Sequence, residues 1–320
     1  MKAFRWLSIL AGLALVPAAE AQTYPDKPIK VVNGFGAGGG TDLLLRTILP
    51  KLGEILGQQL IIDYRPAAGG NLAMDIVAKA PPDGYTLLMG SPGLATNPFL
   101  YRDLGWDAKK DFAPISLLGT VQNVLVVNPA LPVHSVADLV KLAKEKPLTF
   151  GSGGAGAFHH LMGELFKTEM GIPMTHVPYK GTLPALNDVI AGHIDLMFSD
   201  LAPAYSLIQA GKVRALGVTT AQRAASAPEI PTLAEVGVPG FDWAAWQAVA
   251  VPGATPKEII AKLNSAVNAA TAQPDVEKQL VSLQFIPVGK KSPEELERFV
   301  RSETARWAKV LQQAGVAGSE

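Results

Sequence analysis

The chain has 320 residues, no cysteine, and equal numbers of acidic and basic side chains. A net charge of zero without any basic block argues against a nucleic-acid partner. The lack of cysteine excludes disulfides, thiolate metal sites and a cysteine nucleophile. The length allows one large domain or two ordinary ones.

The N-terminus is typical of a secretory signal peptide. Lys2 and Arg5 precede an apolar run over residues 7–16, and Ala19-Glu20-Ala21 has the small-x-small pattern of a cleavage site. The apolar run is too short to span a bilayer. We therefore expect residues 1–21 to be removed, the mature chain to begin at Gln22, and the protein to be exported to the periplasm.

A glycine-rich turn follows the first expected strand, residues 29–32. The turn reads Asn-Gly-Phe-Gly-Ala-Gly-Gly-Gly-Thr-Asp over residues 33–42, and a helix-forming apolar run comes next. A strand-to-helix turn directs unpaired backbone N–H groups and the positive end of a helix dipole into one concavity. Glycine suits this turn because it permits positive φ and has no Cβ to keep a ligand away. The pattern predicts an anion site that needs no cationic side chain.

The same arrangement occurs a second time. A strand at residues 148–150 leads into Phe-Gly-Ser-Gly-Gly-Ala-Gly over residues 150–156, and a helical run follows from 158 to 170. Two such turns, more than a hundred residues apart, predict two α/β lobes that share one cleft.

Strands and helices alternate along the rest of the chain, which predicts parallel sheets covered by helices. Residues 121–127 are expected to form one strand that crosses into the second lobe, and residues 248–251 a strand that crosses back. Lobe 1 is then 22–124 plus 248–320, lobe 2 is 125–247, and a hinge joins them. Trp243 and Trp246 are expected to pack in the hinge or the core. The scattered histidines predict no metal site, and we expect no cofactor.

Two alternative functions follow from the same residues. Gly34-x-Gly36-x-x-Gly39 matches the dinucleotide fingerprint, with Asp63 near the position of a ribose-binding acid, so a nucleotide-binding oxidoreductase is one alternative. Export argues against it. An exported hydrolase using Ser152 and a histidine is the other, although Phe150 breaks the G-x-S-x-G pattern. A hydrogen bond between Ser152 and His159, His160 or His176 would favour the hydrolase.

A set of motifs in a fixed order resembles a known family. The set comprises the loop at 35–42, Tyr-Arg-Pro-Ala-Ala-Gly-Gly-Asn at 64–71, Gly-Tyr-Thr-Leu-Leu at 84–88, Asp-Phe-Ala-Pro-Ile at 111–115, His-Val-Pro-Tyr-Lys-Gly at 176–181 and Pro-Thr-Leu-Ala-Glu at 231–235. The whole mature chain is similar to the Bug-type extracytoplasmic solute receptors, the binding proteins of tripartite tricarboxylate transporters.

The resemblance implies an α/β, two-lobed, type II periplasmic-binding-protein fold, with two Rossmann-like lobes and a two-strand hinge. It implies a monomeric receptor, not an enzyme, that closes on a small organic carboxylate and delivers it to membrane transporter subunits. The binding residues that it implies are Phe35, Ala37, Gly38, Gly39, Thr41, Asp42, Ser152, Gly153, Gly154, Gly156, Ala157, Phe158, His160, Tyr179, Lys180, Thr182 and Asp200, with Ser199 also at the cleft.

The sequence departs from the family pattern at two places. Ala157 and Phe158 stand where hydroxyl residues are common, which makes the pocket more apolar and favours an aromatic or otherwise apolar-bodied carboxylate over citrate. Asp200 stands where an amide or hydroxyl residue is common. A carboxylate there disfavours a second anionic group on the ligand, unless water or a ligand donor intervenes.

Overall fold

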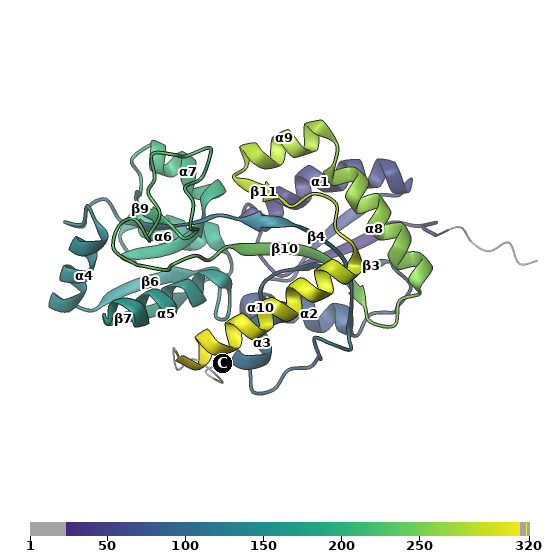
Figure 1. Ribbon diagram of the computed structural model, residues 1–320, viewed down its shortest axis with the longest axis horizontal. Coiled ribbons are helices and arrows are strands. Elements are labelled where there is room, and N and C mark those ends of the chain that lie inside the picture. The colour runs from purple at the N-terminus through teal and green to yellow at the C-terminus, as the bar shows by residue number, and fades with distance from the viewer. Residues whose placement is uncertain (1–23, 314–317, 319–320) are drawn as a thin grey trace, which may run out of the picture.

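The computed structural model describes residues 24–313 and Gly318, so the predicted signal peptide lies outside the described residues. Two β-sheets, each flanked by helices, form two lobes along the longest axis of the molecule (Figure 1). This confirms the predicted two-lobed α/β fold.

Lobe 1 contains a six-stranded sheet in the order β11-β4-β10-β3-β1-β2. Two groups of helices cover it, α1, α8 and α9 on one face and α2, α3 and α10 on the other (Figure 1). The strands are β1 (Ile29–Asn33), β2 (Leu60–Tyr64), β3 (Thr86–Gly90), β4 (Phe112–Val121), β10 (Ala245–Pro252) and β11 (Phe285–Pro287). The helices are α1 (Gly40–Leu56), α2 (Asn71–Ala78), α3 (Gly93–Leu100), α8 (Lys257–Thr271), α9 (Pro274–Ser282) and α10 (Pro293–Gln313).

Lobe 2 contains a five-stranded sheet in the order β7-β6-β8-β5-β9. Its strands are β5 (Asn123–Val127), β6 (Leu148–Ser152), β7 (Met174–Pro178), β8 (Leu196–Asp200) and β9 (Arg214–Val218). Its helices are α4 (Val136–Glu145), α5 (Phe158–Met170), α6 (Thr182–Ala191) and α7 (Leu201–Gln209). Neighbouring residues of β6 face different helices, Phe150 toward Gly163 of α5 and Gly151 toward Ala185 of α6, as the alternation along a strand requires.

The sheets are mixed, so the expectation of parallel sheets is wrong. Strands β1, β2 and β3 pair in parallel, as do β6, β7 and β8. The strands next to the crossings run the other way: β10 is antiparallel to β3 and β4, and β5 is antiparallel to β8 and β9. β5 follows β4, and β10 follows β9, without a helix in between, so no helical crossover sets the direction of either strand.

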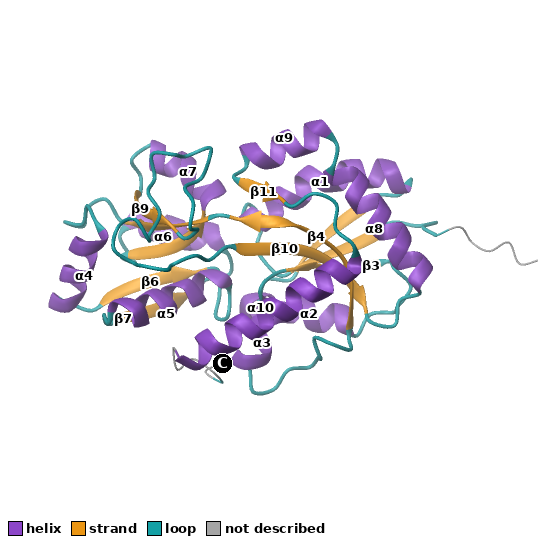
Figure 2. Cartoon of the chain, viewed as in Figure 1, coloured by secondary structure: helices purple, strands orange, loops and turns teal. Residues whose placement is uncertain are grey.

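Residues 121–127 do not form the single crossing strand that the sequence predicted, so that prediction is also wrong. β4 ends at Val121 in the first sheet and β5 begins at Asn123 in the second, with Gln122 between them. β4 and β10 lie next to each other and lead into the two segments that connect the lobes (Figure 2).

Aromatic side chains pack where the lobes meet. Trp307 of α10 lies edge-on to Phe158 of α5, with ring centroids 6.0 Å apart, and 4.5 Å from the ring of Trp243. Trp246 is buried against Phe299. This confirms that the two tryptophans predicted for the hinge or the core are packing residues.

Candidate functional site

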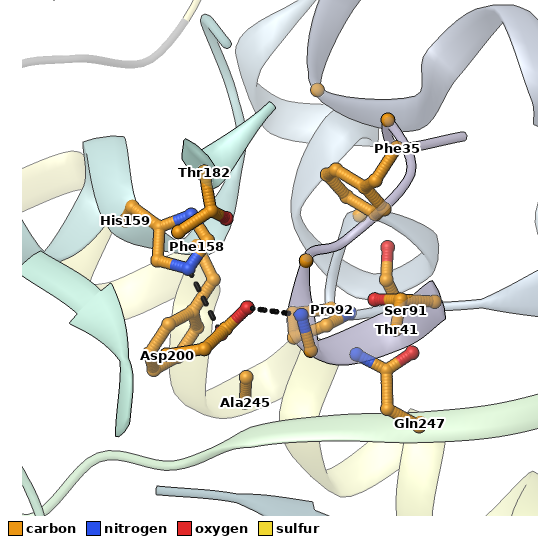
Figure 3. Close-up of a pocket in the computed structure, with 15 residues that line it drawn as sticks. Phe35, Thr41, Ser91, Pro92, Phe158, His159, Thr182, Asp200, Ala245 and Gln247 are labelled. Carbon is orange, nitrogen blue, oxygen red and sulfur yellow. Dashed lines mark hydrogen bonds and ion pairs between the residues drawn. The ribbon is translucent and has the colours of Figure 1, made fainter. Parts of the chain in front are cut away.

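A pocket lies between the two lobes. Phe158, His159, Thr182 and Asp200 of lobe 2 line one side, and residues of the first glycine loop and of the turns after β2 and β3 line the other (Figure 3). Its lining consists of Phe35, Gly36, Gly39, Gly40, Thr41, Gly69, Ser91, Pro92, Gly93, Phe158, His159, Thr182, Asp200, Ala245 and Gln247. The cavity volume is about 30 Å³.

Asp42 shapes the first glycine loop from within. Its carboxylate accepts hydrogen bonds from the Gly38 amide at 2.8 Å, from Arg46 Nε at 2.9 Å and from the Tyr64 hydroxyl at 2.5 Å. Burial alone would raise the pKa of Asp42, but the bonds from Tyr64, Gly38 and Arg46 outweigh it and hold this pKa below its ordinary value. Asp42 therefore fixes the loop as an ionised group, while Gly38 adopts a positive φ of 81°.

Asp200 ends β8 and bonds across the cleft. One carboxylate oxygen accepts from the Gly40 amide of lobe 1 at 3.1 Å, and the other from Asn123 at 3.0 Å and from His159 Nε2 at 3.0 Å (Figure 3). Burial by itself would raise the pKa of Asp200, but His159 and the bonds from Gly40 and Asn123 keep it below its ordinary value. Asp200 thus places an ionised carboxylate at the N-terminus of α1.

Glycines allow the backbones of the two lobes to touch. A Cβ added to Gly69, which has a φ of 58°, would lie 2.5 Å from the Ala155 carbonyl oxygen and 2.6 Å from the Ala157 nitrogen. The Tyr101 hydroxyl of lobe 1 also donates to the Ala155 carbonyl at 3.1 Å. The lobes are closed on each other around the pocket.

The predicted site residues divide into two groups. Those that line the pocket are Phe35, Gly39, Thr41, Phe158, Thr182 and Asp200. Those that do not line it in this closed structure are Ala37, Gly38, Asp42, Ser152, Gly153, Gly154, Gly156, Ala157, His160, Tyr179 and Lys180. Lys180 is exposed at the surface, and the Tyr179 hydroxyl donates to Asp188 at 2.6 Å.

Sequence reasoning missed several lining residues. Ala245 and Gln247 lie two apart on β10, so both face the pocket, but the expected crossing strand began only at residue 248. Ser91, Pro92 and Gly93 follow β3, and their place at the end of that strand was the signal that could have found them. The sequence analysis predicted His160 as a binding residue, whereas its neighbour His159 lines the pocket.

A polar cluster of the buried Ser152 and His160 and the half-buried His176 lies behind the second glycine loop. Ser152 Oγ is 2.7 Å from His176 Nε2, the His160 and His176 rings stack with centroids 3.9 Å apart, and His160 Nδ1 accepts from the Gly156 amide at 3.0 Å. Burial lowers the pKa of His160 to about 4, and burial together with His160 lowers that of His176 to about 3.

The hydrogen bond between Ser152 and His176 is the contact that would favour the hydrolase alternative. Ser152 is nevertheless fully buried and away from the pocket lining, and the depressed pKa makes His176 a weak base.

The dinucleotide alternative has less support from the geometry. Asp63, its ribose-binding candidate, pairs with Arg65 at 2.9 Å and with Lys30 at 3.8 Å and does not line the pocket. Within residues 24–313, no group of three or more histidine or carboxylate side chains could hold a metal ion. None of the helices in that range is long and apolar enough to cross a membrane.

Comparison with known proteins identifies the family. A family model described as tripartite tricarboxylate transporter family receptor matches residues 44–316. The solved structure "R. palustris Rpa4515 with adipate" is 42% identical, with a TM-score of 0.88, and the match covers 92% of this chain and 99% of that one. The periplasmic binding protein BugD is 31% identical, with a TM-score of 0.89 and the same coverage. MatC of Rhodopseudomonas palustris, solved with bound malate, is 31% identical, with a TM-score of 0.84 over 90% of this chain and 100% of its own. The chain therefore belongs to the receptor family of the tripartite tricarboxylate transporters, as its resemblance to the Bug-type receptors predicts.

Proposed function

We propose that the protein is a periplasmic receptor that captures a small organic carboxylate by hinge closure and delivers it to membrane transporter subunits. The observation that carries this proposal is a pocket closed between the first glycine-rich turn of lobe 1 and residues of lobe 2 at the start of α5, the start of α6 and the end of β8. The solved relatives with adipate and malate support a carboxylate as the ligand. The signal-peptide pattern and the family support the periplasm as its location.

The pocket chemistry suits binding without a reaction. The lining has apolar walls from Phe35, Pro92 and Phe158, and none of the lining residues is a lysine or arginine. A charge-assisted hydrogen bond contributes roughly 1.5–3 kcal/mol, and micromolar affinity needs about 8 kcal/mol. Three or four such bonds and a buried apolar body account for the affinity that a scavenging receptor needs, before the cost of association.

Thermal melting of the purified protein against a ligand panel tests this function. The panel holds citrate, dicarboxylates, amino acids, nicotinate, benzoates and phthalates, with NAD as the probe for the oxidoreductase alternative. A ligand at a hundred times its dissociation constant adds about 2.7 kcal/mol, which raises the melting temperature of a chain of this size by several degrees. We expect a shift with one class of carboxylate. A shift with NAD alone would contradict the proposal.

Within that class, we propose that the ligand has one carboxylate and an apolar body. Asp200 already places a negative charge in the pocket, and Phe158 places an aromatic ring there. The wild type should prefer benzoate to phthalate, and hexanoate to adipate, by at least about tenfold, which is 1.4 kcal/mol. This is where the chain would depart from the solved relative with adipate.

Two variants test that preference in calorimetric titrations. Asp200→Asn removes the fixed charge and should narrow the preference for monocarboxylates by about tenfold. Phe158→Ser should weaken apolar carboxylates relative to citrate, because about 25 cal/mol per Å² of apolar contact is lost. An unchanged ligand preference in both variants would show that neither residue sets specificity.

A further inference from the structure

Asp200 is the one carboxylate among the residues that line the pocket, and no lysine or arginine is among them. Within the described residues, the basic side chain that pairs with it is His159, whose Nε2 lies 3.0 Å from Oδ1. Asp200 is 7% exposed, and it is ionised because its pKa is held below the ordinary value. The closed pocket therefore contains a fixed negative charge that no lysine or arginine of its lining neutralises.

The Asp200 carboxylate has room for one more hydrogen-bond donor. A carboxylate offers about four acceptor positions, two on each oxygen. Oδ1 accepts from Asn123 Nδ2 and from His159 Nε2, both at 3.0 Å, whereas from the described residues Oδ2 accepts one bond, from the Gly40 amide at 3.1 Å. Figure 3 shows the Asp200 side chain reaching from lobe 2 into the space between the two walls of the pocket. One acceptor position on Oδ2 is therefore left for a donor that the ligand carries.

A plain carboxylate adds a second negative charge to this enclosed pocket. Like charges repel strongly where water is excluded, and a buried charge without a partner is costly. A zwitterion, which carries a positively charged nitrogen as well as its carboxylate, brings no net charge, and its nitrogen is attracted to Asp200. This difference holds whether or not His159 is protonated, because the zwitterion always brings one positive charge more than the plain carboxylate does.

The rest of the lining suits both ends of such a ligand. Phe35 of the first loop and Phe158 of α5 line opposite walls of the pocket (Figure 3), and the face of an aromatic ring attracts a cation. On the lobe 1 side, Thr41, Ser91 and Gln247 supply hydroxyl and amide groups that can donate to the ligand carboxylate. The pocket therefore offers neutral donors for a carboxylate and, in the fixed charge and the two rings, partners for a cation.

We propose that the ligand is a zwitterion, a carboxylate whose apolar body carries a positively charged nitrogen, and that Asp200 holds this nitrogen in the closed pocket. The inference deepens the proposed function and rests on it. It narrows the ligand from monocarboxylates in general to amino acids and betaines. The preference for one carboxylate over two, proposed above, follows from the same fixed charge.

Calorimetric titration of the wild-type protein with pairs of ligands of equal shape tests the inference. The pairs are N-methylnicotinate with 3-methylbenzoate, 4-(trimethylammonio)butyrate with 5,5-dimethylhexanoate, and 6-aminohexanoate with heptanoate. Each pair shares one carboxylate and one shape, and only its first member has the charged nitrogen. We expect the zwitterion to bind at least about tenfold more tightly, which is 1.4 kcal/mol, in at least one pair. A pocket that recognises only a carboxylate and an apolar body would prefer the uncharged shape, because a charged nitrogen loses its hydration on burial.

The outcomes separate this inference from the proposed function. Binding of plain carboxylates with no zwitterion favoured over its partner in any pair would overturn the inference and leave the proposed function intact. Failure of every carboxylate and every zwitterion to bind the wild type would contradict the proposed function, and this inference with it.

A variant tests whether Asp200 is the residue responsible. Asp200→Asn keeps the size of the side chain and an oxygen that can accept from Gly40, but it has no charge. The ratio of the zwitterion's affinity to that of its partner should therefore fall by at least about tenfold. Asp103→Asn, which removes an exposed carboxylate outside the pocket lining, should leave this ratio unchanged. Because the ratio is taken within one variant, a general loss of stability or closure cancels. An unchanged ratio in a folded Asp200→Asn protein would overturn the inference, and the wild-type pairs decide the question if this variant does not fold.

Discussion

Replacing Gly69 with alanine should weaken carboxylate binding by roughly 10- to 100-fold while both lobes stay folded. The added Cβ would lie 2.5 Å from the Ala155 carbonyl oxygen, 2.6 Å from the Ala157 nitrogen and 2.7 Å from the Gly156 carbonyl carbon. These are backbone atoms of the opposite lobe and cannot rotate away. Overpacking of this kind costs about 1–3 kcal/mol or more, and each 1.4 kcal/mol is a factor of ten in affinity. Opening the lobes relieves the clash, so the added Cβ raises the free energy of the closed state and not that of the open state.

Gly57→Ala is the matched control for this experiment. Gly57 ends α1 with a φ of 69°, close to the 58° of Gly69, and an added Cβ there meets nothing within 4 Å. Both variants bear the strain of alanine in the left-handed region, about 1–2 kcal/mol. Calorimetric titration should show weak binding for Gly69→Ala and near-normal binding for Gly57→Ala. Equal affinities in the two variants would mean that the observed closure is not part of binding.

Acid should destabilise the protein between pH 6.5 and pH 4 through the stacked pair His160 and His176. Their pKa values, about 4 and about 3, lie below the ordinary value of 6.5. The unfolded chain therefore binds more protons in this range, so the stabilisation is complete above pH 6.5 and is lost as the pH falls through the folded-state values. At pH 4 the loss should be on the order of a few kcal/mol for the pair.

Chemical denaturation across this pH range measures the effect. His176→Gln removes one of the two histidine titrations and should flatten the fall in the free energy of unfolding. His134→Gln, at an exposed site, should not change how steeply the free energy of unfolding falls with pH. The slopes of the two variants are compared with each other, because carboxylates common to both also contribute to acid denaturation. If His176→Gln loses stability as steeply as His134→Gln, the stacked histidine pair is not the cause.

The glycine loops could be predicted because their signal is local. A strand, a run of glycines and a helix in immediate succession define a turn that no other residue types would form as easily. The same local signal placed Phe35, Thr41 and Phe158 at the pocket. Residues that reach the pocket from a distant part of the chain carry no such signal. Gln247 is one of these, since β10 reaches the pocket only because it inserts between β3 and β4.

The sequence alone does not determine which of His159 and His160 faces the cleft. The two residues are adjacent and point about 100° apart on a helix, so only one of them can face the cleft. Which one does depends on where α5 begins and how it lies on the sheet. In the structure α5 begins at Phe158, which turns His159 toward Asp200 and His160 toward Phe150 and His176. The directions of β5 and β10 were missed for a similar reason, because tertiary placement sets them.

The most direct test of ligand capture between the lobes is a crystal structure of the protein grown with the carboxylate that gives the largest melting shift. We predict a ligand enclosed between the lobes, with its carboxylate beside the first glycine loop and its body against Phe35 and Phe158. A ligand bound elsewhere on the molecule, with this pocket unchanged, would contradict capture between the lobes.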